Sequence, residues 1–279
     1  MKGSAKMEIN VLGHSCSYEL YGEGAPMTLL HSVGLSTREG WREQIPFLAK
    51  THRVLSYDFR GLGRSTRGDG PLGVDAFVHD LKALLDHLNH KPGVLMGVSL
   101  GGFVAQSFAL TYPEDVKALI LTSTTCRINP GNEERRQERN RRIRAEGMAC
   151  AVDYQIKSHF PDSFLAAHPG IEPWYRDHYI ANDPENYIEI MQDLGRFNVC
   201  DELRRIACPT LIVAGGADAT SVAGKAPLES ALMLQASIPN AEMEIIPQAN
   251  HYPQIDSSQD FNARIGRFLA KVDARPQRI

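Results

Sequence analysis

Ser99 stands where its hydroxyl could act as a nucleophile. Residues 94–106 read VLMGVSLGGFVAQ, so an apolar run ends at a serine with Gly97 two places before it and Gly101 two places after it. The stretch GVLMGV predicts a strand, and LGGFVAQSFALTYP predicts a helix that begins directly after the serine. Such an abrupt turn brings the flanking glycines together and lifts the hydroxyl to a helix N-terminus, which favours an anion. The alternative is a serine that only caps a buried helix.

A serine hydroxyl needs a base to take its proton and an acid to orient that base. After residue 201 the one histidine is His251, in PQANHYPQ, and Asp218 ends the stretch PTLIVAGGAD. Each could be an ordinary loop residue. However, each follows an apolar run that predicts a strand, and the carboxyl ends of parallel strands share one sheet edge. We therefore expect Ser99, Asp218 and His251 to meet as nucleophile, orienting acid and base, with Asp256 as a less suitable acid.

Two backbone N–H groups would have to stabilise the negative charge that develops on an attacked carbonyl oxygen. One should belong to Leu100, directly after the serine. The other should come from the loop HSVGLS after the predicted strand MTLL, from Val33, where Gly34 allows a sharp turn. The alternative for HSVG is an ordinary turn at the end of a strand.

Strands and helices alternate in the two outer parts of the chain. The predicted strands before residue 126 are MEINVL, CSYELYG, MTLLH, HRVLSYD, GVLMGV and VKALILTST, with helical patterns in WREQIPFLAKT and VDAFVHDLKALLDHLN. The alternation returns with PTLIVAGGAD, APLESALMLQASIPN, AEMEIIPQANH and SQDFNARIGRFLAKV. This pattern predicts an α/β fold with a mainly parallel sheet between two layers of helices.

The middle of the chain lacks convincing strands and has charged helical patterns. We expect a core of residues 1–126 and 206–279, and a helical cap of residues 127–205 that forms the substrate pocket. The stretch NEERRQERNRRIRAEG holds six arginines and four glutamates, and the Glu138–Arg142 spacing favours a solvated, ion-paired helix. Less favoured alternatives are an arginine that binds a substrate carboxylate and a docking face for an acidic partner. The aromatic pocket candidates, which could also simply pack between helices, are Phe160, Phe164, Trp174 and Tyr175.

The composition narrows the class of protein. The 279 residues are 43% hydrophobic with a net charge of -3, which favours one large domain or a domain with an insert. The balanced charge gives no case for nucleic acid or an anionic membrane surface, and no segment approaches the ~20 apolar residues of a membrane span. The first 15 residues lack the apolar stretch of a signal peptide. Five scattered cysteines without a CxxC pair favour free thiols in the cytoplasm, and no metal-ligand spacing appears.

These motifs together resemble the α/β-hydrolase superfamily over nearly the whole chain. The matching stretches are HSVG at 31–34, YDFRGLGRS at 57–65, GVSLGG at 97–102, the strand and acid at 209–218, and NH at 250–251. HSVGLSTREGWREQIPFLA with MGVSLGGFVAQ is similar to the 3-oxoadipate enol-lactonases, as are RAEGM and DPENY in the insert. The superfamily loop usually reads HGxG, so Ser32 is a departure that could tighten the loop or place a hydroxyl near the oxyanion.

The resemblance implies a cofactor-independent serine hydrolase that cleaves an ester or lactone of a small carboxylic-acid-type substrate through an acyl-enzyme. Serine in place of aspartate at the nucleophile position disfavours the dehalogenase and epoxide-hydrolase branches. The alternatives are C–C bond hydrolysis or acyl transfer by the same three residues, and a small-molecule receptor with little turnover. The sequence identifies neither the substrate nor the oligomeric state, and it is compatible with a homo-oligomer.

Overall fold

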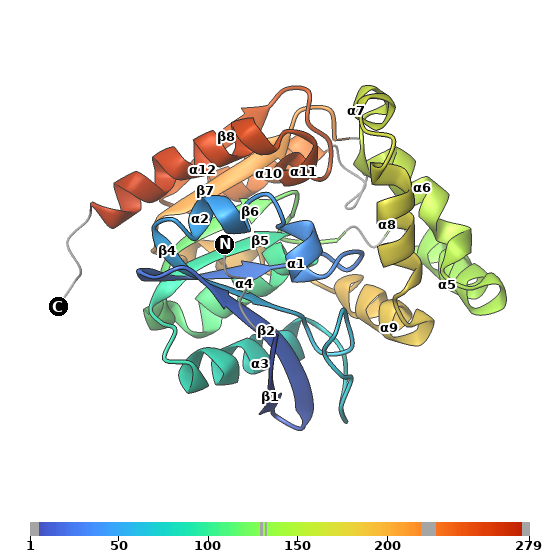
Figure 1. Ribbon diagram of the computed structural model, residues 1–279, viewed down its shortest axis with the longest axis horizontal. Coiled ribbons are helices and arrows are strands. Elements are labelled where there is room, and N and C mark those ends of the chain that lie inside the picture. The colour runs from blue at the N-terminus through green and yellow to red at the C-terminus, as the bar shows by residue number, and fades with distance from the viewer. Residues whose placement is uncertain (1–5, 129–130, 132, 219–226, 275–279) are drawn as a thin grey trace.

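A single sheet of eight strands forms the centre of the computed structural model, which describes residues 6–128, 131, 133–218 and 227–274 (Figure 1). The strand order is β1-β2-β4-β3-β5-β6-β7-β8. The strands are β1 (Met7–Val11), β2 (His14–Tyr21), β3 (Ala25–Leu30), β4 (His52–Tyr57), β5 (Gly93–Val98), β6 (Val116–Thr122), β7 (Thr210–Gly215) and β8 (Ala241–Ile246). Among the eight strands of the described residues, only β1–β2 and β2–β4 pair antiparallel, so the prediction of a mainly parallel sheet is confirmed.

Helices cover both faces of the sheet, as the alternation predicts. The helices that belong to the two outer parts of the chain are α1 (Thr37–Gly40), α2 (Ile45–Leu48), α3 (Val74–His87), α4 (Leu100–Thr111), α10 (Pro227–Ser237), α11 (Pro253–Asp256) and α12 (Ser258–Asp273). α3, α4 and α10 pack on one face, and α1, α2 and α12 lie on the other (Figure 1). Two apolar clusters therefore flank the sheet, which explains why β5 and β7 are buried along their whole length.

The predicted helix in WREQIPFLAKT is shorter than its pattern suggests. Only α2 is regular, because Pro46 has no N–H to donate and fits only the first turn of a helix. Trp41, Ile45 and Leu48 are nevertheless all buried, as the predicted apolar face requires. The periodicity thus identifies the buried side chains more reliably than the length of the helix.

Within the described residues, five further α-helices lie between β6 and β7 and gather at one side of the sheet (Figure 1). They are α5 (Glu133–Glu146), α6 (Ala149–His159), α7 (Asp162–Ala167), α8 (Ile171–Ile180) and α9 (Pro184–Leu194), and a short 3-10 helix, η3 (Cys200–Arg205), follows them. Within the described part of 127–205, extended pairing is limited to the bridge between Arg127 and Asn198. None of the helices in the described ranges combines the length and apolar character that a membrane crossing requires.

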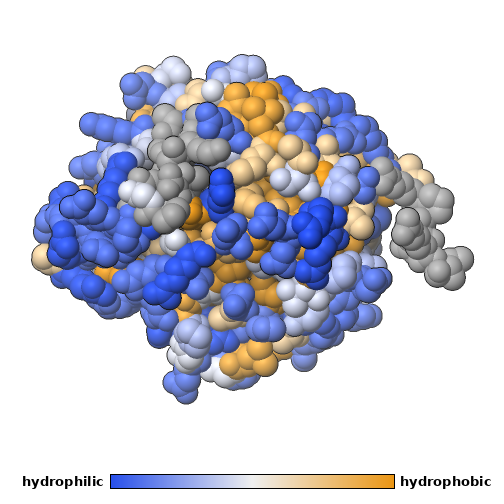
Figure 2. Space-filling model, turned by 180° about the vertical axis from the view of Figure 1, so that it is seen from behind, coloured by the Kyte–Doolittle hydropathy of each residue, from blue (hydrophilic) through white to orange (hydrophobic). Residues whose placement is uncertain are grey.

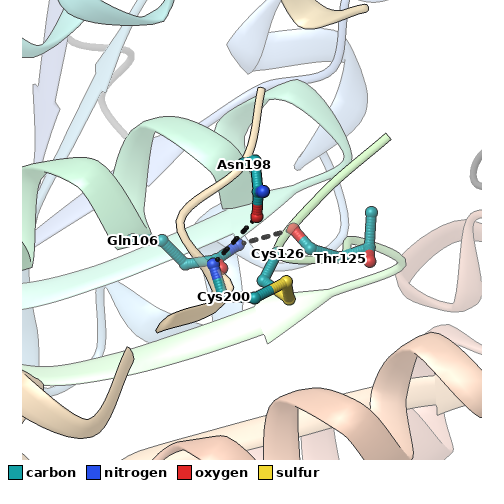
Figure 3. Close-up of a disulfide and its surroundings, with 5 residues drawn as sticks. All are labelled: Gln106, Thr125, Cys126, Asn198 and Cys200. Atoms are coloured by element: carbon teal, nitrogen blue, oxygen red, sulfur yellow. Dashed lines mark hydrogen bonds between the residues drawn. A yellow bond between two sulfur atoms is a disulfide. The ribbon is translucent and has the colours of Figure 1, made fainter. Parts of the chain in front are cut away.

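A disulfide between Cys126 and Cys200 joins the two ends of this helical segment (Figure 3). The expectation of five free thiols is therefore wrong for these two residues. The pair is 74 residues apart in the sequence, and only the return of the chain beside the end of β6 brings the two sulfurs together. Backbone bonds support the junction, since Val199 donates its N–H to Cys126 O at 2.9 Å and Ile128 donates to Phe197 O at 3.1 Å. Cys16, Cys150 and Cys208 are free.

Candidate active site

Ser99 occupies a tight turn between β5 and α4. Its backbone has φ 52° and ψ −113°, a strained conformation for a residue other than glycine. A Cβ at Gly97 would collide with the backbone of Gly101, and a Cβ at Gly101 would collide with the backbone of Leu30. The two glycines therefore make this geometry accessible. The turn leaves Ser99 partly exposed at the N-terminus of α4.

His251 and Asp218 meet in the loops that follow β8 and β7. His251 Nδ1 lies 3.1 Å from Asp218 Oδ2, and the two residues are 3% and 9% exposed. The loops are joined by a bond from the Ala217 N–H to Ala249 O at 2.9 Å, and Gly215 has no side chain to block the Asn250 carbonyl beside it. Because a carboxylate only accepts, Nδ1 donates and the other ring nitrogen is left as an acceptor in the neutral imidazole.

A cavity of about 400 Å³ brings Ser99 and His251 together. Both side chains line its wall, and Asp218 lies beside His251 outside this lining. Val33, Gly34 and Phe103 complete the part of the wall that the core supplies. The remaining lining comes mainly from α5, α6, α8 and α9, so the helical segment and the sheet edge enclose one shared space.

Of the two expected oxyanion donors, Val33 belongs to the cavity lining, whereas Leu100 directly follows Ser99 and lies outside this lining. Leu100 is the first residue of α4, so its N–H belongs to the first turn, where no partner exists inside the helix. Val33 lines the cavity directly. Its loop is anchored by His31, whose Nε2 accepts the Phe59 N–H at 2.9 Å. The stretch YDFRGLGRS, which contains Phe59, therefore supports the loop structurally.

The sequence candidates for substrate binding divide into two groups. Tyr175 is fully buried and lines the cavity. Ser32, Phe160, Phe164 and Trp174 do not belong to the lining. Ser32 Oγ lies 2.9 Å from the Tyr252 hydroxyl, so this hydroxyl pairs within the protein.

The three other aromatic candidates pack between elements. The Phe160 ring lies 5.9 Å from the Phe164 ring and 5.4 Å from the Tyr175 ring, measured between centroids. The guanidinium of Arg42, a residue of the core, lies over the indole ring of Trp174, and its carbon is 4.3 Å from the ring centroid. Phe160, Phe164 and Trp174 therefore fit the alternative stated for them, which is packing against other side chains and not contact with a substrate.

Sequence reasoning missed several residues of the cavity wall, above all His159. Its imidazole stacks on His251, with ring centroids 4.6 Å apart and an interplanar angle of 20°. Tyr179 and Tyr187 also line the cavity, and their hydroxyls are bonded at 3.0 Å. The i, i+4 spacing of Tyr175 and Tyr179 could have placed both on one helix face, whereas nothing in KSHF marks His159.

The arginines of α5 mostly pair with neighbouring glutamates. Arg142 contacts Glu146 at 3.1 Å, and Glu138 pairs with Arg141, so the expected Glu138–Arg142 pair does not form. The reason is that Glu146 lies one turn further along, on the side to which the Arg142 side chain extends. The side of the molecule where α5 lies is accordingly hydrophilic (Figure 2, left).

Arg139 differs from these arginines. Like Arg135, Arg136 and Arg142 it lines the cavity, but its guanidinium carbon lies 5.6 Å from the centroid of the Tyr187 ring. Its polar contact is with the neutral side chain of Asn140, at 3.2 Å, and its Nε is buried without a hydrogen-bond partner within the described ranges. A buried donor without an acceptor is costly, so an anionic group in the cavity would complete this site.

Comparisons with known proteins agree with the architecture. The profile of the alpha/beta hydrolase fold family matches residues 25–149. A 3-oxoadipate enol-lactonase from Acinetobacter baylyi is 28% identical over 92% of this chain and 94% of its own length. A 2-hydroxymuconate semialdehyde hydrolase from a Pseudomonas species is 26% identical over 91% of this chain and 89% of its own. A thermophilic esterase from Thermogutta terrifontis superposes with a TM-score of 0.86 and 27% identity, over 96% of this chain and 99% of that structure.

Proposed function

Because the chain has the α/β-hydrolase fold, we propose that it hydrolyses an ester or a lactone of a small carboxylic-acid-type substrate, similar to an enol-lactone. The observation that carries this proposal is the shared cavity. Ser99 and His251 line it together, and Asp218 holds the far edge of the His251 ring at 3.1 Å. The names of the relatives, a lactonase and an esterase among them, support the same class of reaction.

In the proposed mechanism, Ser99 Oγ attacks the substrate carbonyl carbon while its proton passes to Nε2 of His251, the ring nitrogen that does not face Asp218. Asp218 accepts the Nδ1–H bond and stabilises the imidazolium. The N–H groups of Leu100 and Val33 bind the oxyanion. His251 then gives its proton to the leaving oxygen, and in the second half it takes a proton from the water that cleaves the acyl-enzyme. His251 passes this water proton to Ser99 Oγ as the acyl bond breaks, so the three residues regain their starting protonation and the scheme uses no cofactor.

The helical segment 127–205 is proposed to act as a cap that selects the substrate. Its helices α5, α6, α8 and α9 supply most of the cavity wall, so they exclude water from the reacting groups. Tyr175 would contact the body of the substrate, and Arg139 would bind its carboxylate. Ser32 keeps a supporting role in this scheme because its hydroxyl is bonded to Tyr252.

A second candidate is hydrolysis of a C–C bond by the same three residues, and the similarity to the 2-hydroxymuconate semialdehyde hydrolase favours it. Acyl transfer to an alcohol would also use this geometry. The two reactions and the lactonase activity are separated by product analysis with an enol-lactone, a vinylogous diketone and an ester, each supplied with and without an added alcohol. A receptor with little turnover would bind such a ligand without consuming it.

Active-site labelling tests the proposal directly. We expect a fluorophosphonate to label the wild-type chain at one residue, Ser99, and p-nitrophenyl acetate to be hydrolysed. Ser99→Ala should lose both reactions, and Asp218→Asn should slow hydrolysis by about 10⁴-fold, as in other serine triads. Ser257→Ala, in the turn between α11 and α12, is the matched control that should keep both reactions. Labelling elsewhere, or hydrolysis that survives Ser99→Ala, contradicts the proposal.

A further inference from the structure

The imidazole of His159 is packed face to face on His251. His159 is the last residue of α6, in the helical segment, whereas His251 follows β8 in the core. The ring centroids are 4.6 Å apart and the planes differ by 20°, which is the offset-stacked arrangement that aromatic pairs favour. The stack therefore joins the segment that forms the substrate cavity to the proposed base.

The surroundings of His159 hold the ring in this orientation. Its Nδ1 lies 2.9 Å from the Tyr175 hydroxyl, and the Tyr252 ring meets it edge-on with centroids 5.0 Å apart. Tyr252 in turn is bonded to Ser32, beside the expected oxyanion donor Val33. His159 is 9% exposed and Tyr175 is fully buried, so water has little access to the stacked face.

The His159 ring is neutral. Burial holds the pKa of His159 well below its usual range, and the charge that His251 can carry lowers this pKa further. Its hydrogen-bond partner is a phenol and not a carboxylate, so no negative charge offsets the cost of protonation. His251 is the ring of the pair with a carboxylate at hydrogen-bond distance, so a proton taken from Ser99 would be stabilised on His251 and not on His159.

We propose that His159 is a positioning residue that stabilises the protonated form of His251 through its neutral ring face. This inference rests on the proposed function, because His251 becomes an imidazolium only when it takes the Ser99 proton. A cation is attracted to the face of an aromatic ring, more strongly where water is excluded. The stabilisation appears mainly in the transition state and the tetrahedral intermediate, so it raises kcat more than it changes KM.

The test compares two substitutions at one position. His159→Phe keeps a ring face and loses the nitrogen that contacts Tyr175, whereas His159→Leu keeps apolar volume and loses the ring. We expect His159→Leu to lower kcat for p-nitrophenyl acetate by about three- to thirty-fold with KM within about twofold, and His159→Phe to stay within about threefold of wild type. The acidic limb of the kcat/KM profile should move to lower pH in His159→Leu only.

The other groups around His251 are the same in these variants. Among the described residues they include Asp218 after β7, Asp256 in α11 and the phenol of Tyr252, whose ring in turn contacts the Tyr175 ring. A change of the pH profile between the Leu and Phe variants therefore reports the ring face. His168→Leu is the matched control. His168 also contacts an aromatic ring of the segment, Phe164, in a tilted arrangement with centroids 4.4 Å apart, but it is exposed and lies outside the cavity lining.

A second readout does not depend on turnover. The proton resonances of the His251 ring should carry the ring-current shift of a stacked neighbour in the wild type and in His159→Phe, and lose it in His159→Leu. The pH midpoint of the His251 resonance should be lower in the Leu variant than in the other two. Thermal unfolding of each variant shows that the chain is folded.

The outcomes separate the two proposals. Suppose that the wild type hydrolyses no ester but the pH midpoint of the His251 resonance is still lower in His159→Leu. The proposed function is then wrong, and the proposed effect of the His159 ring on His251 is supported. If hydrolysis depends on Ser99 but the Leu and Phe variants behave alike, in rate and in midpoint, the inference about His159 is overturned. A midpoint that rises in His159→Leu overturns it as well, because His159 would then oppose the charge on His251.

Discussion

Removal of the Cys126–Cys200 disulfide should destabilise the chain strongly. The bond closes a loop whose ends are 74 residues apart in the sequence. In the chain-entropy account, closing a loop of this length removes about 4 kcal/mol of unfolded-state entropy at 25 °C. The free energy of unfolding of the double variant Cys126→Ser/Cys200→Ser should therefore fall by about 2–4 kcal/mol. The upper value applies if the backbone hydrogen bonds beside the two residues persist without the disulfide.

The same change should affect substrate binding more than the chemical step. Phe197, beside the junction, packs edge-on against Phe103 with ring centroids 4.7 Å apart, and Phe103 and Ile128 line the cavity. Ser99, on the β5–α4 turn, does not depend on this junction. We expect KM to rise several-fold while the rate of labelling by a small fluorophosphonate stays within about twofold.

Guanidinium unfolding followed by circular dichroism measures the loss of stability, for the wild type with and without dithiothreitol and for the double variant. Alkylation in denaturant should count three thiols before reduction and five after it. Cys208→Ser is the matched control, because this cysteine is free and half-buried. The reasoning is refuted if five thiols react without reductant. It is refuted equally if the oxidised wild type and the double variant unfold at the same denaturant concentration.

Three further changes have defined outcomes. Gly101→Ala places a Cβ against the Leu30 backbone and should lower the unfolding free energy by about 1–3 kcal/mol and abolish phosphonate labelling, as calorimetry and labelling would show. Arg139→Met should raise KM about tenfold for esters that carry a carboxylate and leave neutral esters unchanged in steady-state kinetics; equal effects on both would contradict the proposed contact. Burial raises the pKa of Asp256 to about 6, so this carboxyl stabilises the folded chain when protonated and its contribution is lost as the pH rises through 6. Asp256→Asn should then add on the order of 2 kcal/mol at pH 8 relative to pH 4.5 in denaturant titrations; an unchanged pH dependence would show that the folded chain does not perturb this group.

The strands and the close turn at Ser99 could be predicted because they depend on local patterns. A short, uninterrupted apolar run such as GVLMGV indicates a strand that is buried on both faces of a parallel sheet. The glycines at positions 97 and 101 leave the space that the tight turn at Ser99 requires. The positions of Asp218 and His251 after strands followed from the same rule. Residues 219–226, after the acid, lie outside the described residues.

The contacts across the helical segment could not be predicted, because they depend on how helices pack against one another. The spacing that favoured a Glu138–Arg142 pair was correct as a distance along a helix, but Glu146 offered a competing partner. The disulfide and the stack on His251 join residues 74 and 92 positions apart, and no periodicity connects such positions. The disulfide and the stack both form only because the helical segment returns to the core, and this path does not follow from local sequence patterns.

The junction at Cys126 and Cys200 also has a consequence for protein engineering. The two Cα atoms are 5.0 Å apart, and the strands that the segment connects, β6 and β7, are direct neighbours in the sheet. The helices from α5 to α9 are thus inserted at what is geometrically a single attachment point. A foreign helical module of another length, with ends that close to a similar spacing, could be transplanted there without any change in the register of the two strands.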